Sequence, residues 1–151
     1  MTTRQAFKVF AIATIFLGIA LVPLGIAQVD SPNKGFGEIE VFAIIIFIAV
    51  IIFAIQFTKN VDAKFVFSMS QVVIGIYPLL MFLMIFGWAV WGAFNIFLIP
   101  LFVFFHPVSI IATATSIAFF IRNRQAKNLI PIALSITPLV VTFIFSLLSY
   151  G

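Results

Sequence analysis

The chain contains no cysteine and has very few acidic residues. The absence of cysteine excludes disulfides, thiol nucleophiles, iron–sulfur ligation and c-type haem attachment. The only acidic residues lie in predicted loops or at predicted helix ends: Asp30, Glu38, Glu40 and Asp62. Paired-carboxylate catalysis within an apolar segment is therefore excluded. We expect no enzyme activity, no catalytic residue, no cofactor and no metal site.

Charged residues of any sign are also scarce. They make up 8% of the chain against 64% hydrophobic residues, which leaves too little polar surface to coat the protein in water. Uncharged stretches extend over Val9–Val29, Val41–Thr58, Phe65–Ile121 and Asn128–Gly151. Each is long enough to cross a hydrocarbon core of about 30 Å, which takes about 20 helical residues. The stretches are apolar throughout rather than alternating, so they predict an all-α integral membrane protein rather than a membrane barrel.

The longest of these stretches is too long for one span. As a single helix, Phe65–Ile121 would measure about 85 Å, nearly three bilayer cores. The segment Trp88–Asn95 combines two tryptophans with glycine and asparagine and predicts the break. We therefore predict one transmembrane helical domain over 1–151, with short loops. It is a bundle of five transmembrane helices, several of them proline-kinked, with spans at about 7–28, 39–58, 65–87, 96–121 and 129–149.

The basic residues predict the orientation of the chain. Lysine and arginine stay on the cytoplasmic side of short loops, and five spans place all but Lys34 on that side: Arg4, Lys8, Lys59, Lys64, Arg122, Arg124 and Lys127. If Phe65–Ile121 crossed the membrane once or three times, the loop with Lys59 and Lys64 and the loop with Arg122, Arg124 and Lys127 would lie on opposite sides of the membrane. We expect a cytoplasmic N-terminus and an external C-terminus in a bacterial cytoplasmic membrane, with archaeal and organellar membranes as alternatives. A cleaved signal peptide at the first segment is the less favoured alternative to a retained helix.

The net charge of +4 does not indicate nucleic-acid binding, because the cations lie in short loops rather than along one face. The expected partner is the lipid bilayer. Three residues of one loop, Arg122, Arg124 and Lys127, are candidate contacts to anionic lipid headgroups, although topology alone explains their charge.

Small and polar residues within spans usually mark contacts between helices. They recur at spacings of three, four or seven in four of the predicted spans: Thr14, Gly18, Gly25 and Gln28; Ser68, Gln71, Gly75 and Pro78; His106, Ser109, Thr113 and Ser116; Ser135, Pro138, Thr142, Ser146 and Ser149. We predict that these stripes face the interior and interpret them as ordinary packing seams in preference to a solvated pathway. The second span has no such stripe and is predicted to lie at the edge of the bundle.

His106 is the only histidine and lies beside Pro107 within the fourth predicted span. A histidine at membrane depth can relay protons, bind metal or donate a hydrogen bond between helices. No acidic residue is available at its depth to complete a relay. We therefore favour a neutral imidazole that faces the bundle interior.

The sequence supports two functional hypotheses. It has no phosphate loop, dinucleotide-binding glycine pattern, zinc-protease motif or nucleophile elbow, so lipid enzymology is the weakest reading. The first hypothesis is a structural or accessory subunit that packs with itself, as a homo-oligomer, or with partner membrane proteins. The alternative is a transporter or channel for a small or lipophilic solute along a polar seam of the first, third, fourth and fifth helices. The candidate seam residues are Gln71, Asn95, His106, Ser109 and Thr113.

Overall fold

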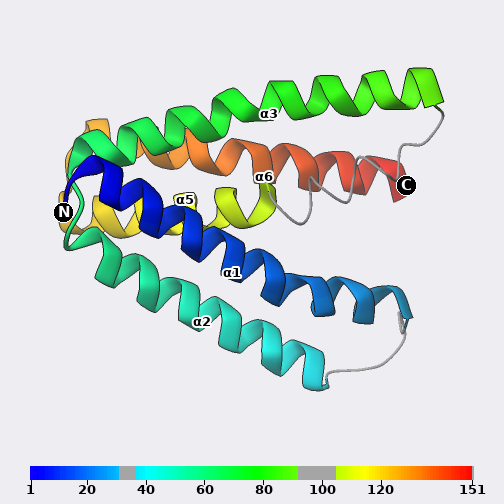
Figure 1. Cartoon of the computed structure of the whole chain (residues 1–151), viewed down its shortest axis with the longest axis horizontal. Coiled ribbons are helices and arrows are strands. Elements are labelled where there is room, and N and C mark those ends of the chain that lie inside the picture. Colours follow the sequence, from blue (N-terminus) through cyan, green and yellow to red (C-terminus); the bar gives the residue numbers. More distant parts are fainter. Residues whose placement is uncertain (31–36, 92–104, 151) are drawn as a thin grey trace.

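The structure is a computed structural model that describes residues 1–30, 37–91 and 105–150 of the chain. Within these ranges it contains helices and no strand. The elements are α1 (Thr3–Asp30), α2 (Glu38–Thr58), α3 (Ala63–Trp91), α5 (His106–Arg122), a single 3₁₀ turn η2 (Ala126–Asn128) and α6 (Leu129–Tyr150). The helices lie roughly side by side along one direction (Figure 1).

Four of the described helices contain segments long and apolar enough to cross a membrane. These segments are Thr3–Pro23, Glu40–Thr58, Ala63–Leu80 and Ala126–Ile144, and α5 is a shorter apolar helix. The predicted first, second, third and last spans each coincide with a helix. The predicted fourth span, 96–121, is described only from position 105 onward. The predicted break at Trp88 is too early, because α3 continues to Trp91; the remaining positions of that break, 92–95, lie outside the described residues.

One end of the bundle gathers most of the positive charge. The N-terminus, the α2–α3 connection and the α5–α6 connection lie together at this end, and the C-terminus lies at the opposite end (Figure 1). The seven basic residues there, Arg4, Lys8, Lys59, Lys64, Arg122, Arg124 and Lys127, are all exposed, as is the acidic Asp62. We call this the basic end of the bundle.

Local hydrogen bonds close the α2–α3 turn at the basic end. At the end of α2 the amide N–H groups of Lys59 and Asn60 donate to the carbonyls of Gln56 (3.3 Å) and Phe57 (3.1 Å), and α3 begins where the Asp62 carbonyl accepts from the N–H of Phe65 (3.0 Å). These bonds occupy backbone groups that the ends of α2 and α3 would otherwise leave unpaired.

The α5–α6 turn is held by a buried asparagine. Asn128 is 2% exposed, and its Nδ2 donates to the carbonyl of Asn123 over 2.8 Å. The side chain thereby supplies a partner to a backbone carbonyl beyond the end of α5. It fixes the path by which the chain turns back into α6.

A cluster of phenylalanines joins α1, α2 and α3 near the basic end. The ring of Phe65 is 1% exposed and meets three others edge-on, with centroids 4.9 Å from Phe7, 6.3 Å from Phe10 and 5.5 Å from Phe57. Edge-to-face pairs at such distances are favourable beyond the area they bury. This cluster anchors α1 against the start of α3.

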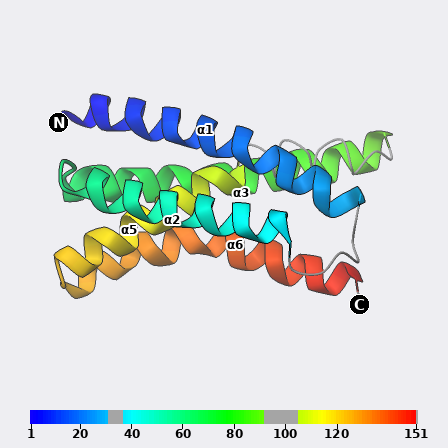
Figure 2. The same ribbon diagram turned by 90° about the horizontal axis from the view of Figure 1, so that it is seen from below.

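The helix α5 lies in the interior of the bundle and α2 lies at its edge. α5 contacts each of the other four long helices, whereas α2 contacts chiefly α5 and α1. Large side chains of α2 remain exposed, among them Ile45 at 57%, Phe47 at 63% and Ile52 at 55%. The predicted peripheral position of this helix is confirmed, and Figure 2 shows α2 in front of α5 and α3.

The prolines occupy two kinds of position. Pro23, Pro78 and Pro138 lie inside α1, α3 and α6. Pro107, expected well inside its span, stands in the first turn of the described α5, where no N–H donor is needed. Pro100 lies outside the described residues.

Candidate functional site

A short polar contact between helices joins α5 and α6. Ser109 and Ser135 are both fully buried, and the Ser109 hydroxyl donates to the Ser135 carbonyl over 2.6 Å. A serine at this position lets the two backbones approach closely while its hydroxyl finds a partner away from lipid. The inward orientation predicted for Ser109 and Ser135 is therefore confirmed.

Other buried or half-buried hydroxyls turn back onto their own helices. Thr14 donates to the carbonyl of Phe10 (2.8 Å), Ser116 to Ala112 (2.8 Å) and Thr142 to Pro138 (2.7 Å). Each bond spans four residues, the usual arrangement for a hydroxyl inside a helix. These side chains act as small packing residues with their polarity locally satisfied.

His106 lies half-buried at the start of the described α5. Its ring centroid is 6.5 Å from that of Phe105, and the Phe105 ring stacks at 5.8 Å on Tyr77 of α3. The imidazole thus stands beside an aromatic contact between α3 and α5. It shares α5 with the buried Ser109 and Thr113, two of the predicted seam residues.

The predicted stripe of α3 is the one that does not face inward. Gln71, Gly75 and Pro78 are exposed, and Asn95 lies outside the described residues. The buried face of α3 carries larger side chains in addition to one serine: Phe65, Val66, Met69, Ser70 and Val73. Where both surroundings are apolar, hydrophobicity does not select a face, and interlocking side chains decide instead. The prediction that Gln71, Gly75 and Pro78 point inward is wrong, and Gln71 does not join Ser109 and Thr113.

This exposed stripe forms a continuous strip on the outside of the bundle. We call Gln71, Gly75, Pro78 and Phe82 the α3 outer face; their spacings of four, three and four keep them on one side of the helix. No atom outside its own helix lies within 4 Å of where a Cβ of Gly75 would stand. The strip continues into Phe86, whose ring stacks on Phe82 at 6.2 Å. Within the described bundle, nothing packs onto Gly75.

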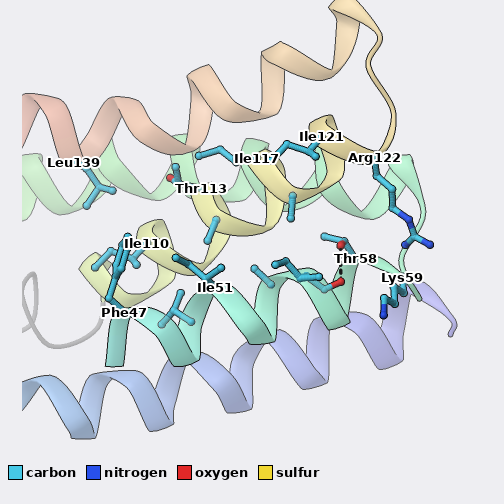
Figure 3. A pocket seen from close by; sticks show the side chains of 15 residues that line it. Phe47, Ile51, Thr58, Lys59, Ile110, Thr113, Ile117, Ile121, Arg122 and Leu139 are labelled. Atoms are coloured by element: carbon cyan, nitrogen blue, oxygen red, sulfur yellow. Dashed lines mark hydrogen bonds between the residues drawn. The ribbon is translucent and has the colours of Figure 1, made fainter. Parts of the chain in front are cut away.

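A second feature of the surface is a groove between α2 and α5. It has a volume of about 760 Å³ and is lined almost entirely by apolar side chains (Figure 3). The lining residues are Phe47, Val50, Ile51, Ala54, Ile55, Thr58 and Lys59 of α2, Ile110, Thr113, Ala114, Ile117, Ala118, Ile121 and Arg122 of α5, and Leu139 of α6. Small residues of both helices, Ala54, Ala114 and Ala118, leave the space that the larger ones border.

Polarity in the groove is concentrated at one end. Lys59 and Arg122 lie together at the basic end, as Figure 3 shows, while Phe47 and Leu139 border the other end. The Thr58 hydroxyl beside Lys59 already donates to the carbonyl of Ile55 over 3.0 Å. The acidic residue nearest to Lys59 in the sequence is the exposed Asp62, which does not line the groove. The groove is thus cationic at its mouth and, apart from the Thr113 hydroxyl, apolar along its length.

Of the three predicted headgroup contacts, Arg122 alone lines this groove. Arg124 and Lys127 are exposed in the α5–α6 connection away from it. Lys59 was not predicted. Its position in the sequence was the available signal. Lys59 and Arg122 each follow the last apolar residues of a helix, and both helices end at the basic end. Pairing those two helices required the tertiary structure.

Neither ligand chemistry nor similarity identifies a function. Among the described residues there is no group of three histidine, cysteine or acidic side chains that could hold a metal ion. The chain matches no protein-family model, no curated protein and no solved structure. The α3 outer face and the groove therefore have to be interpreted from their own chemistry.

Proposed function

We propose that the chain is a five-span membrane protein with a cytoplasmic N-terminus and an external C-terminus, and that it acts as a structural or accessory subunit. In this proposal it packs with itself, or with a partner membrane protein, through the α3 outer face. The observation that carries the proposal is an exposed glutamine beside an uncovered glycine on a helix apolar enough to span a bilayer.

The depth of Gln71 in the membrane makes its exposure energetically costly. It lies eight residues after Ala63, so about 12 Å along the helix axis from the start of α3 and well within a core of about 30 Å. An amide without a partner in hydrocarbon costs several kcal/mol. A contacting helix that supplies a partner removes this cost, and Gly75 one turn away allows its backbone to come close.

A second copy of the chain meets these requirements. In a dimer with its twofold axis along the membrane normal, equivalent residues lie at equal depth and face one another, so Gln71 of one protomer meets Gln71 of the other. A glutamine amide has both a donor and an acceptor group, so the pair is self-complementary. The spacing of the α3 outer face suits a packed pair of helices.

Packing is favoured over transport because the predicted seam residues do not line one path. Gln71 lies outside the bundle, and Ser109 and Ser116 donate to backbone carbonyls. The buried hydroxyls of Thr113, Thr115 and Ser135 have no hydrogen-bond partner among the described residues. A conducting seam needs polar groups that face a common path and replace the solvation of a solute.

The basic end supports the proposed orientation. All seven described basic residues lie there, and such residues remain cytoplasmic during insertion. A bacterial cytoplasmic membrane is the expected location.

Crosslinking of single-cysteine variants tests the proposed interface. Because the chain has no cysteine, Gly75→Cys introduces a unique thiol, and Ile45→Cys on the exposed surface of α2 is the control. Oxidation in native membranes should give a covalent dimer at position 75 and not at position 45. A purely monomeric chain on blue-native electrophoresis in mild detergent, without crosslinking at position 75, would refute self-packing.

A glutamine substitution tests the polar contact itself. Gln71→Leu should weaken the dimer by about 1–2 kcal/mol, the upper range for polar contacts between membrane helices. Gln56→Leu is the matched control, because Gln56 is also exposed but lies near the end of α2. Equal dimer fractions for both variants would remove Gln71 from the interface.

A further inference from the structure

The groove between α2 and α5 combines two properties that a membrane lipid also combines. Its walls are apolar over most of their length, and its two cations, Lys59 and Arg122, stand at one end. We propose that it holds one anionic phospholipid of the cytoplasmic leaflet, with an acyl chain along the walls and the phosphate at Lys59 and Arg122.

The length of the groove fits a single leaflet. From Lys59 to Phe47 the α2 axis covers twelve residues, about 18 Å. One leaflet contributes roughly 15 Å of the hydrocarbon core. An acyl chain that starts at the mouth can therefore follow most of the groove before it reaches the midplane. The aliphatic walls offer it dispersion contacts along this path.

The charge at the mouth selects the headgroup. Lys59 caps the C-terminus of α2, and Arg122 lies in the last turn of α5. Each helix C-terminus carries about half a negative charge, so two full positive charges leave a net of about +1 at the mouth. Arginine and lysine both bind phosphate, arginine through a bidentate fork. A zwitterionic lipid offers the same phosphate with its charge offset by an amine, and is held less tightly.

The position of the mouth agrees with this occupant. It lies at the basic end, which meets the headgroup region of the cytoplasmic leaflet in the proposed orientation, on which this inference rests. The groove is on α2 and α5, whereas the proposed self-packing face is on α3, so lipid binding and dimerisation are separate properties. Either can fail without the other.

Lipid retention measured by native mass spectrometry tests the headgroup contact. The full chain is purified in mild detergent with equal amounts of phosphatidylglycerol and phosphatidylcholine. The wild type should retain one phosphatidylglycerol per chain in preference to phosphatidylcholine. Lys59→Gln combined with Arg122→Gln should reduce that preference by about tenfold or more, since each basic residue contributes to anionic lipid binding.

The matched control removes the same charge elsewhere at the same end. Arg124→Gln combined with Lys127→Gln alters two exposed cations that do not line the groove, and it should keep the preference within about twofold of wild type. An equal loss in both double variants would reduce the effect to general surface charge and overturn the proposal. No preference in the wild type would also overturn it.

A steric variant tests the acyl-chain path. Ala118→Phe fills the groove from α5, while Ala49→Phe adds the same ring to an exposed position of α2 outside the groove. The first should abolish retention of phosphatidylglycerol and the second should not, with unchanged thermal unfolding of both. Retention by Ala118→Phe would exclude the groove as the site. Disulfide dimers of Ala118→Cys in native membranes would assign the groove to a second copy and likewise overturn the proposal.

Discussion

At the scale of single residues, Ser109 shows how a small polar side chain sets a helix separation. It is fully buried and donates to the carbonyl of Ser135 on α6. Two demands meet at this position: the side chain must be small enough for close packing, and its hydroxyl must have a partner. Both demands could be predicted from the sequence, because serine recurs on one face of α5 and on one face of α6.

Substitutions at Ser109 should separate these two demands. Ser109→Ala loses only the hydrogen bond and should cost about 0.6 kcal/mol, the average for such contacts in membranes. Ser109→Leu also forces the helices apart and should cost about 1–3 kcal/mol. Thr137→Ala, which removes an exposed hydroxyl of α6, is the control. Unfolding in mixed micelles measures the order, and a Leu variant as stable as the Ala variant would contradict it.

Asn128 plays a comparable role outside the apolar segments. Its amide holds the α5–α6 turn through the carbonyl of Asn123. Asn128→Ala should destabilise the protein by about 1 kcal/mol, because the turn loses the hydrogen bond that the buried Asn128 amide donates, while the Gln125 N–H still donates to the same carbonyl. Asn60→Ala, at an exposed position of the α2–α3 turn, should cost little. Equal melting temperatures for the two variants would show that the turn does not depend on this bond.

At the scale of helices, the sequence predicted where helices occur along the chain better than which of their faces point inward. The stripes of α5 and α6 point inward at Ser109, Thr113, Ser116, Ser135 and Pro138, as expected, and α1 does so at Thr14 and Gly18. The same reasoning failed for α3 because a stripe of small residues indicates a contact with another helix but does not show whether that helix belongs to the same chain. The groove was not predictable either, since its space arises from alanines on two helices whose pairing depends on tertiary structure.

The phenylalanine cluster gives a prediction at this scale. Phe65→Ala removes a ring that contacts α1 and α2, and it should cost about 3 kcal/mol or more from lost packing and the cavity left behind. Phe143→Ala, at an exposed position of α6, is the matched control and should cost far less. Thermal unfolding of the two purified variants makes the comparison, and similar losses would mean that the cluster does not anchor these helices.

At the scale of the whole molecule, charge and apolar length together gave most of the architecture. Four helices long enough to span a membrane and one shorter apolar helix follow from where the sparse charges fall. The N-terminus and the α2–α3 and α5–α6 connections, which carry the basic residues, lie together at one end of the bundle, as the sequence predicted. The break between the third and fourth predicted spans was placed too early, because tryptophans at the membrane interface do not end an apolar helix and α3 continues to Trp91.

The orientation can be measured directly. A phosphatase that folds only outside the cytoplasm should be active when fused after Tyr150, and a fluorescent protein that folds only in the cytoplasm should be bright when fused before Met1. The reverse pattern, with phosphatase fusions inactive and cytoplasmic reporters active after Tyr150, would refute the proposed topology.

The phenylalanine cluster also has a consequence for biosynthesis. Its members Phe7, Phe10, Phe57 and Phe65 all belong to the first part of the chain, so this contact can form before α5 and α6 have left the ribosome. We expect α1, α2 and the start of α3 to assemble as an early unit into which the later hairpin inserts. Cysteines at positions 7 and 65 should then crosslink in stalled nascent chains that end before α5, and a crosslink confined to full-length chains would place this contact last in assembly.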